Sequence, residues 1–107
     1  MNEVEVVRAL AALAQSLRLR VFRLLVVAGK TGLTPGAIAE ALEVPAATLS
    51  FHLKDLMHSG LVTQERNGRH LIYRASFEHM DQLLGYLTSN CCRDELGLVE
   101  AGASCGC

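Results

Sequence analysis

The stretch PAATLSFHLKDLMHSGLV, residues 45–62, decides the fold of this chain. Its leucines recur at steps of four and three residues, which is the spacing of one apolar face of an α-helix. These leucines are Leu49, Leu53 and Leu56. Pro45 suits the first helical position and Gly60 suits a C-terminal cap. The stretch therefore predicts a helix from Pro45 to about Ser59, with an apolar inner face and a polar outer face.

Three more helices are predicted before this stretch. Apolar residues with helical spacing predict the first helix, and they are Val4, Val7, Ala11 and Ala14. The second helix is expected to begin with Ser16 as its N-cap and to end at Gly29. The third is expected to begin at Thr34-Pro35, an N-cap followed by proline, and to end near Leu42. A tight turn then joins the third helix to the fourth, which is the outline of a helix-turn-helix unit.

After residue 60 the apolar period changes to two, which predicts β-strands. The expected strands are Leu61–Arg66 and Arg69–Ala75, and Asn67-Gly68 between them indicates a hairpin. Ser76 is expected to cap a last helix. The apolar seam of that helix is Phe77, Met80, Leu84, Leu87 and Cys91. This seam packs either on the protein's own core or on a second copy, and we favour the second copy because so small a domain gains from pairing.

These elements define the predicted fold class, which is mainly α with a β-hairpin wing. It is a winged helix-turn-helix in the order α-α-α-α-β-β-α, acting as a homodimer. In such units the fourth helix enters the major groove of DNA, and its outward residues reach bases and phosphates. The candidate DNA-binding residues are Ala47, Thr48, Ser50, Phe51, His52 and Lys54 on the helix, with Arg66 and Arg69 at the hairpin. The candidate dimerisation residues are Val7, Leu10, Met80, Leu84 and Leu87.

Some of these candidates have plainer explanations. Thr48 and Ser50 would also suit an ordinary helix surface, and the two arginines would also suit a solvated turn. His52 precedes a core leucine, so it would also suit the edge of the core.

Composition limits the classes of protein that remain. The chain has 107 residues, half of them hydrophobic, and a formal net charge of −1. Residues 46–77 carry four Lys or Arg against two Asp or Glu, whereas residues 78–107 carry one against five. A basic middle can bind nucleic acid locally although the whole chain is not basic. No apolar stretch reaches the roughly 18 residues of a membrane span, and the N-terminus lacks a signal-peptide pattern. We therefore expect a cytoplasmic protein whose partners are DNA and a second copy of itself, with no membrane.

All four cysteines lie in the last 17 residues, at Cys91, Cys92, Cys105 and Cys107. We therefore divide the chain into a winged-helix domain, residues 1–92, and a flexible cysteine-containing tail, residues 93–107. In a reducing compartment, clustered cysteines bind metals or respond to oxidation more often than they form structural disulfides. Three thiolates suit As(III) or Sb(III), and four suit tetrahedral Zn(II) or Cd(II). A redox switch and a tail without function are the remaining alternatives.

Three motifs follow one another in this chain in an order that is typical of one known family. They are Thr48-Leu49-Ser50-Phe51-His52-Leu53-Lys54-Asp55-Leu56, then Ser59-Gly60-Leu61-Val62, then Arg66-Asn67-Gly68-Arg69 followed by Tyr73. With them the chain resembles the ArsR/SmtB family of metal- and metalloid-sensing repressors over roughly residues 8–92. The resemblance implies a homodimeric winged helix that dimerises through its first and last helices. It also implies a protein that represses an operon until an effector binds.

The chain departs from this family at two known kinds of site. Many arsenic-sensing members carry Cys-Val-Cys in the third helix, but Pro35–Leu42 has no cysteine. Zinc-sensing members often place pairs of Asp and His on the last helix. Here His79 and Asp81 lack a second pair, so we expect His79 to be a surface residue.

Asn90-Cys91-Cys92 resembles the Asn-Cys-Cys that some arsenic-responsive members combine with a downstream cysteine. The resemblance favours a repressor that releases its operator when As(III) or Sb(III) binds the C-terminal thiolates. Cys105 and Cys107 compete for the third place, within one subunit or between two. A Zn(II)- or Cd(II)-responsive repressor and a thiol-redox-responsive regulator are the alternatives.

An enzyme, such as a thiol reductase, is the hypothesis from another class. The chain has no Cys-x-x-Cys, no phosphate-binding loop and no acid–base constellation, so we do not expect catalysis. A winged helix that binds only proteins is a further alternative, and a binding assay with promoter DNA separates it from a repressor.

Overall fold

The structure is a computed structural model that describes residues 1–89. All four cysteines lie outside the described residues, and so do the predicted end of the seam at Cys91 and the predicted tail 93–107. The predictions made for them stay predictions.

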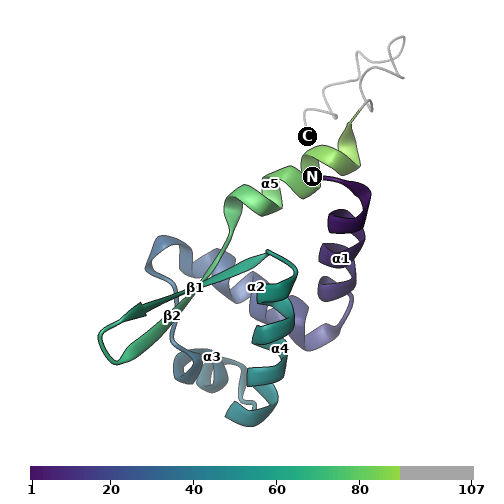
Figure 1. Cartoon of the computed structure of the whole chain (residues 1–107). Helices are drawn as coiled ribbons and strands as arrows, with labels where there is room; N and C mark the ends of the chain where they lie inside the picture. The colour runs from purple at the N-terminus through teal and green to yellow at the C-terminus, as the bar shows by residue number, and fades with distance from the viewer. Residues whose placement is uncertain (90–107) are drawn as a thin grey trace.

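The described residues form five α-helices and one β-hairpin (Figure 1). In chain order the elements are α1 (Glu3–Leu13), α2 (Ser16–Ala28), the short 3-10 helix η1 (Gly29–Thr31), α3 (Pro35–Leu42), α4 (Ala46–His58), β1 (Val62–Asn67), β2 (His70–Ala75) and α5 (Phe77–Thr88). In Figure 1 the hairpin projects to the left of the helices, and α5 extends upward with α1 beside it. No helix among residues 1–89 is both long and apolar enough to cross a membrane. This order confirms the predicted winged helix-turn-helix.

Two helices begin differently from the prediction. The N-cap of α2 is Gln15 rather than Ser16, because Gln15 has the extended backbone and its side chain accepts a hydrogen bond from the Arg18 backbone N–H at 2.8 Å. Pro45 is extended as well, and it is the N-cap of α4 rather than its first helical residue. The predicted Thr34 cap of α3 is confirmed, since its hydroxyl accepts from the backbone N–H of Ala37 at 3.2 Å.

The hairpin turn lies one residue later than predicted. The register pairs Asn67 with His70, so the two-residue loop is Gly68-Arg69 and not Asn67-Gly68. Gly68 has a φ of +68° and Arg69 has a negative φ, which is the pattern of a type II′ turn with glycine first. The asparagine therefore remains paired as the last residue of β1.

A short backbone pairing attaches the hairpin to the helices. The Leu33 N–H donates to the Tyr73 carbonyl at 3.0 Å, and the Tyr73 N–H donates to the Leu33 carbonyl at 2.8 Å. Leu33 thus forms a one-residue bridge beside β2, just before α3 begins. The link holds the wing next to the helix-turn-helix unit, and the sequence pattern gave no sign of it.

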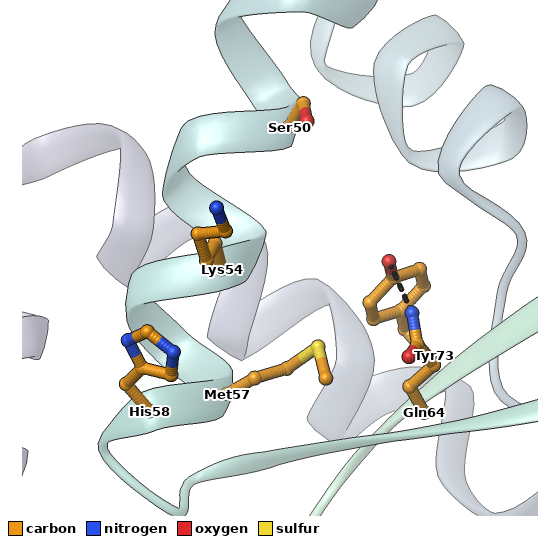
Figure 2. A pocket seen from close by; sticks show the side chains of 6 residues that line it. All are labelled: Ser50, Lys54, Met57, His58, Gln64 and Tyr73. Atoms are coloured by element: carbon orange, nitrogen blue, oxygen red, sulfur yellow. Dashed lines mark hydrogen bonds between the residues drawn. The ribbon is translucent and has the colours of Figure 1, made fainter.

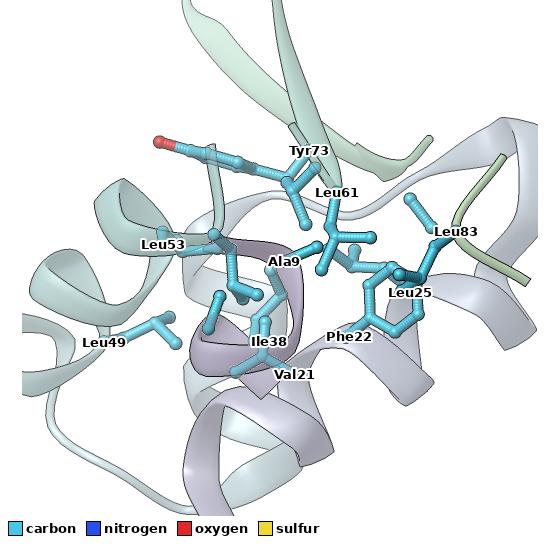
Figure 3. Packing of buried hydrophobic residues seen from close by; sticks show 14 of the residues in the cluster. Ala9, Val21, Phe22, Leu25, Ile38, Leu49, Leu53, Leu61, Tyr73 and Leu83 are labelled. Carbon is cyan, nitrogen blue, oxygen red and sulfur yellow. The ribbon is translucent and has the colours of Figure 1, made fainter. Parts of the chain in front are cut away.

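The core lies where α1, α2, α3 and α4 meet under the hairpin. Leu49, Leu53 and Leu56 are buried as predicted, and Figure 3 shows Leu49 and Leu53 pointing into the cluster that includes Ile38 and Val21. The core residues of α1 are not those whose spacing predicted the helix. Its buried residues are Val6, Ala9 and Ala12, whereas the series predicted from the sequence, Val4, Val7, Ala11 and Ala14, is exposed.

The last helix, α5, packs against this core through few residues. Leu83 is its one deeply buried side chain among the residues described. His79 was expected at the surface, and this expectation is wrong. Its ring is half-buried against Gly60, where a Cβ atom would come within 2.7 Å of ring atoms, and its buried Nε2 has no hydrogen-bond partner among residues 1–89. Because glycine leaves this space open, the ring fits between the end of α4 and the start of α5.

Candidate nucleic-acid interface

The outer face of α4 is a polar surface next to one exposed aromatic ring. The three buried leucines of α4 fix which way the helix faces. Their burial leaves Ala47, Thr48, Ser50, Phe51 and Lys54 exposed. Phe51 is 73% exposed, which is unusual for so large an apolar side chain. Five of the six predicted helix contacts therefore share an accessible surface.

The turn before α4 is held by the backbone. Glu43 ends α3 in the left-handed conformation with a φ of 54°, and the Val44 N–H donates to the Ala39 carbonyl at 3.1 Å. Pro45 then restricts the backbone before the first turn of α4. This tight connection sets the direction in which α4 leaves α3.

A hollow of about 300 Å³ separates α4 from the wing (Figure 2). Its lining residues are Ser50, Lys54, Met57 and His58 from α4, with Gln64 and Tyr73 from the hairpin. Gln64 and Tyr73 are cross-strand partners, and the Gln64 amide donates to the Tyr73 hydroxyl at 2.8 Å. Sequence reasoning did not single out Gln64 and His58, which line this hollow. The strand alternation that places Gln64 opposite Tyr73 was the available signal.

A second hollow lies on the outward side of α4. It is lined by Ala47, Ser50, Phe51 and Lys54. Ser50 and Lys54 line both hollows, so they form the ridge between the helix surface and the gap beside the wing. Two of the predicted polar contacts of α4, Ser50 and Lys54, thus lie at the centre of the candidate interface.

The charges around α4 and the wing favour an anionic partner. The two acidic residues of residues 46–77 are both ion-paired. Asp55 binds Arg18 at 3.1 Å, and Glu65 binds Arg74 at 2.7 Å. Lys54, Arg66 and Arg69 are exposed and form no ion pair within residues 1–89. The pairing removes the acids as competitors and leaves three cations for phosphates.

His52 occupies a different place from the other candidates. It lies on the flank of α4 that faces α2, where its half-buried ring places Nδ1 3.4 Å from the Arg18 guanidinium. This placement favours the core-edge explanation of His52 over a contact with DNA.

The predicted dimerisation residues form an exposed apolar surface on α1 and α5. Val7, Leu10, Leu84 and Leu87 are all exposed, whereas Met80 is half-buried against the protein's own core. Beside Leu84 lies a hollow of about 430 Å³ that is lined by Asp81, Leu84, Gly85 and Thr88. So much exposed apolar surface on one pair of helices indicates a covered interface.

The described residues do not assemble a metal site. No group of three or more His, Cys, Asp or Glu within residues 1–89 is placed to hold an ion. The four cysteines lie outside these residues.

The fold and the exposed face of α4 define a winged helix-turn-helix protein, and comparisons with known proteins agree. A family model described as a helix-turn-helix domain matches residues 13–65. The HTH-type transcriptional repressor SmtB of Mycobacterium tuberculosis is 40% identical over 47 residues, which are 44% of this chain and 35% of that repressor. The chain thus spans about a third of the length of the curated relative it matches.

Solved structures are similar over most of the chain. An ArsR-like transcriptional regulator from Rhodococcus sp. RHA1 has a TM-score of 0.76 and 23% identity, covering 94% of this chain and 92% of its own. The homodimeric winged helix-turn-helix DNA-binding domain of a possible ArsR-family regulator from Mycobacterium bovis has a TM-score of 0.65 and 28% identity, covering 85% of this chain and 82% of its own. The chain is therefore similar in fold, and in sequence over its helix-turn-helix segment, to transcriptional regulators of the ArsR/SmtB family. Such regulators are not a class of enzymes.

Proposed function

We propose that the protein is a transcriptional repressor that binds operator DNA through α4 and the wing. The observation that carries this proposal is the charge arrangement around α4. Exposed polar residues at Thr48 and Ser50 are flanked by three cations that form no ion pair within residues 1–89, while the nearby acids are paired. Hydroxyl groups can bond to base edges, and the cations can bond to phosphates.

We propose further that the protein binds DNA as a homodimer through α1 and α5. The exposed apolar residues of these two helices support this, and the similar domain from Mycobacterium bovis is homodimeric. A two-fold dimer would present two copies of α4 to half-sites about 34–36 Å apart, which is one turn of DNA.

Binding to duplexes of the promoter upstream of the protein's own gene tests the DNA half of the proposal. Ser50→Ala should weaken binding to the promoter about tenfold and leave binding to random duplex unchanged, because it removes a base contact. Arg69→Ala should weaken binding to both duplexes and lower the slope of log affinity against log salt by about 1, because it removes a phosphate contact. Fluorescence anisotropy across a salt series measures both effects.

The two variants act as controls for each other. Equal loss of promoter and random binding in Ser50→Ala would contradict base reading by α4. A wild-type protein without preference for its promoter over random DNA would contradict the repressor proposal as a whole.

As the effector we propose As(III) or Sb(III), held by C-terminal thiolates. Cys91 and Cys92 follow α5 closely in sequence, and Cys105 or Cys107 would supply a third sulfur. Soft trivalent ions prefer thiolates, and each As–S bond formed from arsenite releases one water. The described part of the chain offers no competing cluster of ligands. Ligation of residues next to α5 would bias the dimer towards a geometry with weaker operator binding, typically by about 1–3 kcal/mol.

Titration of the reduced protein with arsenite tests the effector. We expect one ion per chain by sulfur–arsenic absorbance, together with release of promoter DNA. Cys92→Ser should abolish both, and single Cys105→Ser and Cys107→Ser variants identify the third thiol. Release by Zn(II) or Cd(II) alone, or by a thiol oxidant alone, would replace this effector with one of the alternatives. Unchanged release in Cys92→Ser would remove the vicinal pair from the mechanism.

A further inference from the structure

One arginine joins three helices at the back of the candidate interface. Arg18 lies in the first turn of α2, and its side chain is 19% exposed. Its Nε donates to the carbonyl of Ala12 in α1 at 2.7 Å. Its Nη1 donates to the Asp55 carboxylate of α4 at 3.1 Å and lies 3.4 Å from Nδ1 of His52. We call these contacts the Arg18 bracket.

On α4 the bracket holds the flank of the helix. His52 and Asp55 are three residues apart, so they project from the same side of α4. This side lies between the buried leucines and the exposed face that carries Ser50 and Lys54. A contact at two points one turn apart resists rotation of α4 about its own axis, and such rotation would redirect the exposed side chains.

On α1 the bracket holds the end of the helix. The Ala12 carbonyl belongs to the last turn of α1, whose carbonyls have no donor within the helix. A cation at this end is also favoured by the helix dipole. The same helix carries Val7 and Leu10, which belong to the exposed apolar surface. Arg18 therefore links the proposed dimerisation helix to the proposed recognition helix.

We propose that Arg18 is a positioning residue for operator recognition, fixing the orientation of α4 relative to α1. The inference rests on the proposed function, because it presumes that α4 reads DNA and that α1 forms the dimer. Arginine suits this task since its planar fork donates in fixed directions to several acceptors at once. Lysine offers a point charge on a flexible stem and cannot hold the Ala12 carbonyl and the Asp55 carboxylate in the same way.

The test compares Arg18→Gln and Arg18→Lys with Arg23→Gln in the full chain. Arg23 is an exposed residue of the same helix, so its variant matches the loss of charge without touching the bracket. We expect Arg18→Gln to weaken promoter binding about tenfold while random duplex binding changes less than about twofold. Arg18→Lys should behave more like Arg18→Gln than like wild type, and Arg23→Gln should bind the promoter like wild type.

The salt dependence separates positioning from direct contact. A positioning residue leaves the slope of log affinity against log salt unchanged, whereas an arginine on a phosphate lowers that slope by about 1. A lower slope in Arg18→Gln would overturn the proposal, and so would promoter affinity equal to wild type. Equal loss of promoter and random binding would overturn it too, because it indicates general damage to the fold.

Two further measurements keep the proposal testable if one variant or the proposed function fails. Asp55→Asn removes the ionic half of the bracket at a residue that is 53% exposed, and it should weaken promoter binding in the same direction without unfolding the protein. Hydrogen exchange of the free protein needs no DNA. Faster exchange in α4 of Arg18→Gln, but not of Arg23→Gln, is expected, and equal exchange would contradict the bracket. If the wild type shows no preference for the promoter, the proposed function fails. A difference in exchange between Arg18→Gln and Arg23→Gln would in that case still show that Arg18 holds α4 in place.

Discussion

At the scale of single residues, the exposed ring of Phe51 is the clearest sign of a surface that a partner covers. The ring adjoins Ala47, Ser50 and Lys54 around one hollow, so it lies within the candidate interface rather than apart from it. Covering a phenylalanine ring contributes about 1.5–3 kcal/mol, and contact with a thymine methyl group is one way in which DNA can do so.

Phe51→Ala should therefore weaken promoter binding about tenfold. Its free energy of unfolding should change by less than about 0.5 kcal/mol, because the ring has little to lose in the folded protein. Anisotropy and chemical denaturation measure the two quantities. Val27→Ala is the matched control, since Val27 is 82% exposed on α2 and should alter neither. Full promoter affinity in Phe51→Ala would place the ring outside the interface.

Single residues were predictable where one simple rule decides their place. The leucine spacing of α4 correctly predicted its buried face, and the exposed candidates followed from it. His79 was not predictable, because its burial depends on Gly60, a residue far from it in sequence that leaves room for the ring. The Arg18 contacts were missed for the same reason, since a basic residue in a helix pattern does not reveal an acceptor 37 positions later.

At the scale of elements, the joint between η1, Leu33 and β2 holds the wing to the helices. Gly32 lies at this joint with a φ of +67°, and a Cβ atom there would come within 2.7 Å of the Tyr73 carbonyl oxygen and of Ile72. The same carbonyl accepts the hydrogen bond from the Leu33 N–H. A side chain at this position would thus push on backbone that cannot move without breaking the bridge.

Gly32→Ala should destabilise the protein by about 3–5 kcal/mol, the sum of steric overlap and the strain of a backbone conformation, φ 67° and ψ −175°, that is essentially limited to glycine. Gly29→Ala is a close control, because Gly29 has a similar φ of +65° but open space around its Cβ direction. It should cost only about 1–3 kcal/mol, from backbone strain alone. Thermal or urea unfolding compares the two, and equal losses would show that the Leu33 joint does not constrain the wing.

The elements themselves were largely predictable, whereas their ends were not. Helix periods, Thr34-Pro35 and the hairpin signal correctly predicted which segments are helices and strands. The N-cap at Gln15 and the turn at Gly68-Arg69 were displaced by one residue from the predictions. Such shifts depend on backbone conformation and strand register, which neighbouring elements decide.

At the scale of the whole molecule, the exposed surface of α1 and α5 and the outer face of α4 depend on each other. Two copies of α4 can meet adjacent half-sites only if the dimer holds them at one separation. Apolar residues that face solvent in one copy, such as Leu84, would set this separation in the pair. The sequence predicted the seam on α5 and also predicted Val7 and Leu10 of α1 as dimerisation residues, which are exposed. It did not predict that α1 would bury Val6.

Leu84→Glu should therefore dissociate the dimer without unfolding the subunit. Leu84 is 51% exposed, so a carboxylate there costs little in one copy but would be buried in a pair. We expect at least a tenfold rise in the dimer dissociation constant by analytical ultracentrifugation, with weaker promoter binding in proportion. Gln82→Glu adds the same charge roughly 200° around the helix and should leave the dimer intact. A stable dimer in Leu84→Glu would move the interface away from this surface, and the spacing of the two α4 helices would then need another origin.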